Sequence, residues 1–190
     1  MVSNSCGQIT SQQQTWGARQ RWSRRYHPAG RSPATRRIVF LDIDGVLAPI
    51  RQWDRYGDLD PACIRVLNDI VLDGDAEVVV SSTWRYGKTV AELQAMLAAE
   101  GFIGTVIDKT PVGGPGSDRG DEIAAWLAQH DVPGYVIIDD HSDMGALRSH
   151  LVLTQPARGL QPADAARAIV VLGRSPNGGP PNERASRRPS

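Results

Sequence analysis

The chain has 190 residues, of which 41% are hydrophobic and 22% charged, and its formal net charge at pH 7 is zero. This composition suits one globular domain with some chain to spare. No apolar run approaches the ~18 residues of a membrane span, no secretory signal opens the chain, and two cysteines exclude a disulfide framework, so we expect a soluble cytoplasmic protein.

The charges are distributed unevenly along the chain. Residues 1–37 contain seven arginines and no acid, and residues 174–190 contain four arginines and one glutamate. Residues 38–173 hold ten basic and twenty acidic residues. We therefore expect an acidic catalytic domain at 37–173 between two basic arms, at 1–36 and 174–190.

Both arms lack the apolar content that offsets the entropy of ordering, so we expect them to be disordered. Three aromatic residues interleave with the arginines of the first arm: Trp16, Trp22 and Tyr26. Aromatic stacking and arginine–phosphate contacts would suit nucleic acid. A solvated tail, a leader from an upstream start codon or an organelle transit peptide fits the same composition.

Between the arms, segments with strand and helix patterns alternate. Apolar runs predict buried strands at 36–43, 76–82, 105–107, 135–138 and 151–153. Helices are predicted from Asp60 to about Gly74, from Thr89 onward, and at 119–130 and 162–172. Asp60 followed by Pro61 is a typical helix start, and Thr89 with Glu92 forms a capping box. This alternation predicts an α/β, three-layer Rossmann-like fold around a central parallel five-stranded sheet.

Three of the predicted strands end in polar residues. The first ends in Asp42-Ile43-Asp44-Gly45, the second in Ser81-Ser82-Thr83-Trp84-Arg85, and the fourth in Asp139-Asp140, with Asp143 shortly after. Ligands of open parallel sheets bind outside the carboxyl ends of the strands. The sequence therefore predicts a site at this edge of the sheet.

A group of carboxylates at one edge predicts a magnesium site. Clustered carboxylates raise each other's pKa unless a cation neutralises them. Mg²⁺ prefers oxygen ligands and binds through one or two carboxylates and a substrate phosphate, whereas no His/Cys set has the spacing of a zinc site. The candidate metal ligands are Asp42, Asp44, Asp139 and Asp140.

Asp42 and Asp44 are two residues apart, so they can face the same substrate if the chain stays extended. One carboxylate can attack phosphorus while the other handles the protons of the leaving group and of water. Gly45 allows a tight turn away from the strand.

The segment VFLDIDGVL resembles the first motif, hhhhDxDG, of the haloacid-dehalogenase-like (HAD) superfamily. This resemblance implies that Asp42 is the nucleophile that forms an aspartyl-phosphate, and that Asp44 is the general acid/base whose backbone carbonyl joins the metal. It also implies that Ser81 or Ser82 binds the phosphate, with the spacing to Trp84 favouring Ser82. IIDDHSDM matches the acidic fourth motif, with Asp139, Asp140 and Asp143 as candidates.

The third motif of the superfamily is a lysine or arginine that neutralises phosphate and nucleophile. Arg119, at the start of the helix RGDEIAAWL, lies where the resemblance implies this residue. The helix N-terminus would help to bind an anion. Lys109 and Lys88 are the alternatives.

Residues 37–172 as a whole resemble a compact HAD subfamily that occurs beside, or fused to, RNA-repair enzymes. Neither point where HAD proteins insert a cap domain has room for one, so we expect a minimal cap or none. Trp53 and Tyr56, within 48–59, could form a small flap. An open site suits a bulky substrate, such as a nucleic-acid end, a nucleotide or a phosphoprotein.

The resulting hypothesis is a magnesium-dependent phosphomonoester hydrolase. The alternatives are a non-catalytic module recruited to nucleic acid by its arms, and phosphoryl transfer to an acceptor other than water. A DxD motif also binds metal in sugar-nucleotide transferases, but here no nucleotide-binding strand precedes it. Arg85 could hold phosphate or pair with an acidic neighbour, and Trp84 fits packing better than substrate contact.

Overall fold

The computed structural model of the chain describes residues 37–51, 57–114 and 116–173. The predicted basic arms, and Trp53 and Tyr56 of the predicted flap, lie outside these residues. The elements in chain order are β1 (Arg37–Leu41), α2 (Pro61–Asp73), β2 (Ala76–Val80), η2 (Thr83–Arg85), α3 (Val90–Ala99), β3 (Val106–Lys109), α4 (Arg119–Leu127), β4 (Tyr135–Asp139), η3 (Gly145–His150), β5 (Leu151–Leu153) and α5 (Pro162–Leu172).

The strands form one five-stranded sheet in the order β3-β2-β1-β4-β5, and all neighbouring pairs are parallel. The predicted three-layer α/β fold is confirmed. β1 lies at the centre, so its carboxyl end is flanked by the carboxyl ends of β2 and β4. The strand that carries the acidic motif is thus the most enclosed in the sheet.

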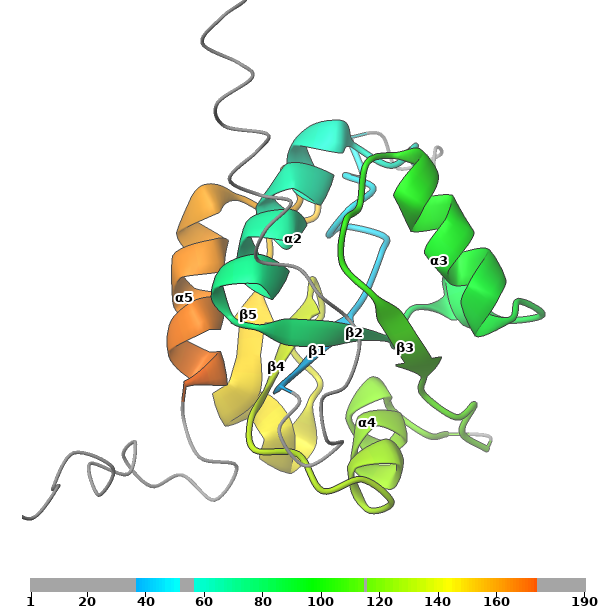
Figure 1. Cartoon of the computed structure of the whole chain (residues 1–190). Coiled ribbons are helices and arrows are strands. Elements are labelled where there is room, and N and C mark those ends of the chain that lie inside the picture. Colours follow the sequence, from blue (N-terminus) through cyan, green and yellow to red (C-terminus); the bar gives the residue numbers. More distant parts are fainter. Residues whose placement is uncertain (1–36, 52–56, 115, 174–190) are drawn as a thin grey trace, which may run out of the picture. The chain divides into compact units, whose positions relative to one another are not determined.

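The helices cover both faces of the sheet (Figure 1). Helices α2, α3 and α5 pack on one face, where they share a hydrophobic cluster with Val39 and Leu41 of β1. Helix α4 and the short helix η3 cover the other face, where they pack in a second cluster with Ile38 and Phe40 of β1. Alternate residues of β1 therefore face opposite layers, as the period of an extended strand requires.

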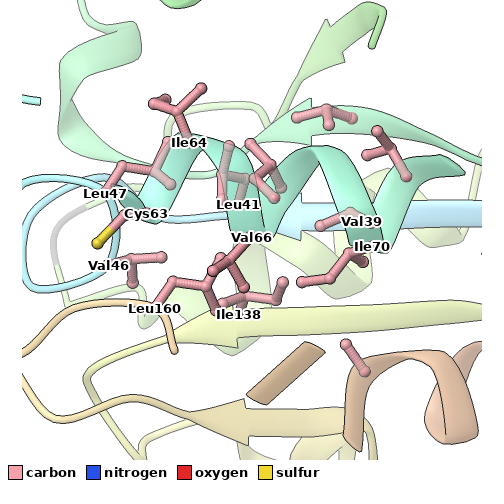
Figure 2. Packing of buried hydrophobic residues seen from close by; sticks show 14 of the residues in the cluster. Val39, Leu41, Val46, Leu47, Cys63, Ile64, Val66, Ile70, Ile138 and Leu160 are labelled. Carbon is pink, nitrogen blue, oxygen red and sulfur yellow. The ribbon is translucent and has the colours of Figure 1, made fainter. Parts of the chain in front are cut away.

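Helix α2 contributes more buried residues to the larger cluster than any other element (Figure 2). Ile64 and Ile70 of this helix are at most 1% exposed and pack over Val39 and Leu41 of the central strand. Cys63 is also buried. Burial of a Leu or Ile side chain typically contributes about 1.5–3 kcal/mol, so this layer provides much of the stability of the domain.

The helix starts follow the sequence signals. The Asp60 side chain accepts a hydrogen bond of 2.8 Å from the Ala62 backbone N–H at the start of α2. Thr89 and Glu92 form the predicted capping box of α3. Both predictions are confirmed because capping depends only on residues within one turn of the chain.

Several element ends differ from prediction by one to three residues. β1 ends at Leu41 rather than at residue 43, and β2 ends at Val80 rather than at residue 82. β3 extends to Lys109 rather than ending at Ile107, because an edge strand tolerates polar residues such as Asp108. α4 ends at Leu127 rather than at residue 130. Beyond its end the backbone N–H groups of residues 129 and 130 bond in a tighter, three-residue pattern.

The described residues of the β1–α2 and β3–α4 connections contain no further helix or strand. This agrees with the prediction of a minimal cap or none. No helix within the described ranges is both long and apolar enough to cross a membrane.

Candidate active site

The carboxyl ends of β1, β2 and β4 bring three predicted site residues side by side. Leu41 is in register with Val80 and Ile138, so the next residues, Asp42, Ser81 and Asp139, are neighbours. The ladder continues through them, with Ser81 N–H donating to the Leu41 carbonyl at 2.9 Å and Asp42 N–H donating to the Ile138 carbonyl at 3.0 Å. By strand alternation their side chains lie on the face covered by α4.

The turn after Asp42 brings a further carboxylate to the site. Gly45 has a φ of +67°, and a β-carbon on it would lie 2.3 Å from Oδ2 of Asp140. Glycine is required here both for the left-handed backbone and for the close approach of Asp140. The turn of the first motif and the acidic pair of the fourth therefore pack directly on each other.

Arg119 bridges two of these carboxylates. Its Nη1 lies 3.0 Å from Oδ1 of Asp42 and 2.9 Å from Oδ2 of Asp139. Burial and the neighbouring Asp42 carboxylate raise the pKa of Asp139 to about 6, although Arg119 opposes this shift. Burial lowers the pKa of Arg119, but the Asp42 and Asp139 charges outweigh it and raise that pKa, so the guanidinium stays charged.

Asp44 is held by Trp84. The indole N–H of Trp84 donates a hydrogen bond of 2.9 Å to Oδ2 of Asp44. The buried Oδ1 of Asp44 has no hydrogen-bond partner among the described residues. Burial raises the pKa of Asp44, the Trp84 hydrogen bond lowers it, and the Asp42 and Asp140 charges raise it further, with a net upward shift. Trp84 thus both packs against the core and contacts a site carboxylate.

Ser81 and Ser82 are both fully buried but differ in their hydrogen bonds. Ser82 caps the short helix η2, with its Oγ accepting from the Trp84 N–H at 3.4 Å. Ser81 Oγ has no partner in the part of the chain that the structure describes. A buried hydroxyl without a partner is costly, so Ser81 is the one poised to bond an external group.

Arg119 and Lys109, two of the three predicted basic candidates, differ in their surroundings. Arg119 contacts Asp42 and Asp139, whereas Nζ of Lys109 donates to the carbonyls of Lys88 at 2.5 Å and of Arg85 at 3.4 Å. Asp143 is exposed, and the hydroxyl of its neighbour Ser142 donates to it.

Arg85 is 1% exposed, and Nη2 lies 2.6 Å from Oε2 of Glu122, so it pairs with an acidic neighbour, one of the two alternatives that its sequence allows. Glu122 was not predicted as a site residue, because it lies 37 residues from Arg85 and on another element. The only hint in the sequence is the position of Glu122, which is an acidic residue one turn after Arg119 and directly before the buried Ile123.

The side chains present fit a hard divalent cation. Asp42, Asp44 and Asp140 surround the turn at Gly45, and one oxygen of Asp44 lacks a partner among the described residues. Ligand atoms of Asp139, Asp140 and His141 lie within 4.8 Å of one another. Carboxylate oxygens predominate in this set, which is the chemistry that Mg²⁺ prefers.

His141 lies at the exposed edge of this group. Its Nδ1 is 2.7 Å from Oδ1 of Asp140. Burial lowers the pKa of His141, but the carboxylates of Asp140 and Asp139 outweigh it, so that the pKa is raised.

Comparison with known protein families gives one match. The family described as "HAD domain in Swiss Army Knife RNA repair proteins" matches residues 38–165, about two thirds of the chain. The matched range includes every residue of the site described above. A comparison with curated proteins found no match.

Proposed function

The chain belongs to the family of HAD domains in Swiss Army Knife RNA repair proteins, and from this premise we propose that it is a Mg²⁺-dependent phosphomonoester hydrolase. The observation that carries the proposal is the Arg119 guanidinium bridging Asp42 and Asp139 at the carboxyl end of the central strand. A cation so placed can hold a phosphate oxygen beside a carboxylate nucleophile.

In the proposed reaction, a carboxylate oxygen of Asp42 attacks phosphorus and displaces the alcohol, which leaves with a proton from Asp44. The raised pKa of Asp44 favours the protonated form that this step needs. Asp44 then takes a proton from water, and the resulting hydroxide attacks phosphorus, releases phosphate and restores the Asp42 carboxylate. The Ser81 hydroxyl and Arg119 hold the non-reacting phosphate oxygens.

Asp42, the backbone carbonyl of Asp44 and the acidic pair Asp139-Asp140 would hold the magnesium ion. The ion supplies positive charge that lowers the repulsion between carboxylate and phosphate. The close approach of Asp42 and Asp139 at one arginine, with Asp140 packed against the Gly45 turn, supports this part of the proposal.

The proposed substrate is a bulky phosphate monoester, such as a phosphorylated nucleic-acid end, a nucleotide or a phosphoprotein, and the proposed compartment is the cytoplasm. We expect an open site because neither connection beside it has room for a cap domain, and the arginine-rich ends of the chain favour an anionic polymer. Turnover of 3′- and 5′-phosphorylated oligonucleotides, nucleotides and phosphopeptides by the full chain would rank these classes.

The direct test is the Mg²⁺-dependent release of phosphate from an aryl phosphate by the wild type and by Asp42→Asn. The substitution removes the nucleophile with little change in shape, so we expect a loss of about 10³-fold or more in kcat. Asp69→Asn, on the exposed side of α2, is the matched control and should retain wild-type turnover. Equal rates for Asp42→Asn and wild type would exclude the assignment.

A further inference from the structure

Arg85 joins the segments on either side of the site. Arginine has five N–H donors in a rigid planar fork. In this structure the fork makes five hydrogen bonds, to the carbonyls of Ser81, Ser82, Thr110 and Pro111 and to the carboxylate of Glu122. Arg85 therefore ties the carboxyl end of β2 to the end of β3 and to α4.

Glu122 completes the connection from the helix side. One oxygen accepts from Arg85 at 2.6 Å, and the other accepts from the Gly113 N–H at 2.9 Å in the loop before α4. Glu122 is 8% exposed, so both partners of the ion pair are largely removed from water. Arg119 lies on the same helix, three residues before Glu122.

A buried ion pair is seldom retained for stability, because desolvation of two charges offsets most of their attraction. Its directional bonds do fix geometry. Here they set the position of the first turn of α4 against the end of β2. These are the two segments that present Arg119 and Ser81 to the same point beside Asp42.

We propose that Arg85 and Glu122 are positioning residues that hold Arg119 and Ser81 at the spacing required by the phosphoryl group. Neither side chain touches substrate; each acts through a residue that does. This inference rests on the proposed hydrolase function. It explains why the fully buried Arg85 donates a hydrogen bond to the backbone carbonyl of Ser81, the serine proposed to bind phosphate.

The first test is Glu122→Gln in the full chain, assayed with an aryl phosphate and Mg²⁺. Glutamine keeps the shape but has only one acceptor oxygen for two donors, so α4 is no longer fixed by both bonds. We expect kcat to fall about 10- to 100-fold, the range typical of groups that orient catalytic residues. Arg85→Lys should show a similar loss, because an ammonium cannot reach five acceptors, and it carries the test if Glu122→Gln does not fold.

A double-mutant cycle separates positioning from general destabilisation. In the Arg119→Ala background there is no guanidinium to misplace, and Arg85 keeps its four carbonyl bonds and so still holds Ser81. Glu122→Gln should therefore lower kcat by less than about threefold there. An equal loss in both backgrounds would overturn the proposal.

Asn68→Ala supplies the structural control. Asn68 is buried on α2, and its side chain bonds the Gly101 carbonyl and the Ile103 N–H, away from the site. At a temperature where both variants are folded, Asn68→Ala should retain wild-type kcat even when its melting temperature is lowered as much as that of Glu122→Gln. A matching loss of kcat in Asn68→Ala would also overturn the proposal.

If the wild type releases no phosphate from the aryl ester, the proposed function fails, and crystal structures then decide this inference. The Nη1–Oδ1 distance between Arg119 and Asp42 is 3.0 Å in the wild type. Glu122→Gln should lengthen it and break the ion pair. An unchanged position of Arg119 would show that Glu122 does not position it.

Discussion

Asp44 shows how one hydrogen bond can tune a carboxylate at the residue scale. Its burial favours the protonated form, and the Trp84 indole N–H favours the ionised form. The balance leaves the pKa above its ordinary value, which suits a group that first donates and then accepts a proton. Trp84 is therefore predicted to affect the pH dependence of turnover rather than only packing.

Trp84→Phe keeps most of the aromatic packing and removes the N–H. Because this bond lowers the pKa of Asp44, its loss should raise that pKa further. A general acid must be protonated, so the alkaline limb of the kcat/KM profile should move to higher pH. The measurement is the pH profile of aryl phosphate hydrolysis. An alkaline limb unmoved or shifted to lower pH would contradict the role of Asp44 as acid.

At the scale of elements, the start of α4 is packed tightly against the loop that follows β4. A β-carbon on Gly120 would lie 2.9 Å from the carbonyl carbon and oxygen of Met144, closer than real contacts allow. The helix therefore approaches the acidic loop through a glycine in its first turn. Gly120 directly follows Arg119 and lies two residues before Glu122 on the same helix.

Gly120→Ala should be destabilising, although alanine is normally favoured over glycine in a helix by about 1 kcal/mol. Overpacking against backbone costs about 1–3 kcal/mol and should displace the first turn of α4, lowering kcat as well. Thermal unfolding and aryl phosphate turnover are the measurements.

Gly173→Ala, at the end of α5, is the matched control for Gly120→Ala. Its nearest contact would be the Val170 carbonyl oxygen at 3.6 Å, an ordinary van der Waals distance. It should change neither stability nor turnover by much. Similar behaviour of the two variants would show that the Met144 contact does not constrain α4.

At the scale of the whole molecule, metal binding should be coupled to stability. Asp42, Asp44, Asp139 and Asp140 converge from two strand ends that are brought together only in the folded chain. A cation that binds this group binds the folded state selectively and stabilises it by about 2.7 kcal/mol at 100 times Kd.

Adding Mg²⁺ at about 100 times its Kd to metal-free protein at pH 7.5 should raise the melting temperature by about 5–11 °C. Asp140→Asn should abolish most of this shift, because it removes a carboxylate that packs against the Gly45 turn. Asp69→Asn should preserve it. Differential scanning calorimetry with and without a chelator is the measurement, and an equal shift in Asp140→Asn would argue against a metal ion at this position.

The elements of this fold could largely be predicted from sequence because their signals are local. Apolar runs predicted the five strands, and capping residues at Asp60 and Thr89 predicted two helix starts. Element ends that were misplaced lack such a signal; for example, β3 continues into polar residues at the sheet edge, and α4 stops without a glycine or proline. The catalytic roles of the motif residues remain predictions.

The sequence by itself determined the alternation of strands and helices and the presence of acidic and hydroxyl residues at strand ends, since these depend on neighbours along the chain. Only the tertiary structure decided which of them meet. Arg119 rather than Lys109 contacts Asp42 and Asp139, and Arg85 finds Glu122, because strand order and register bring residues 20 to 77 positions apart into contact. Pairing across the sheet depends on the packing of whole elements, which no local pattern records.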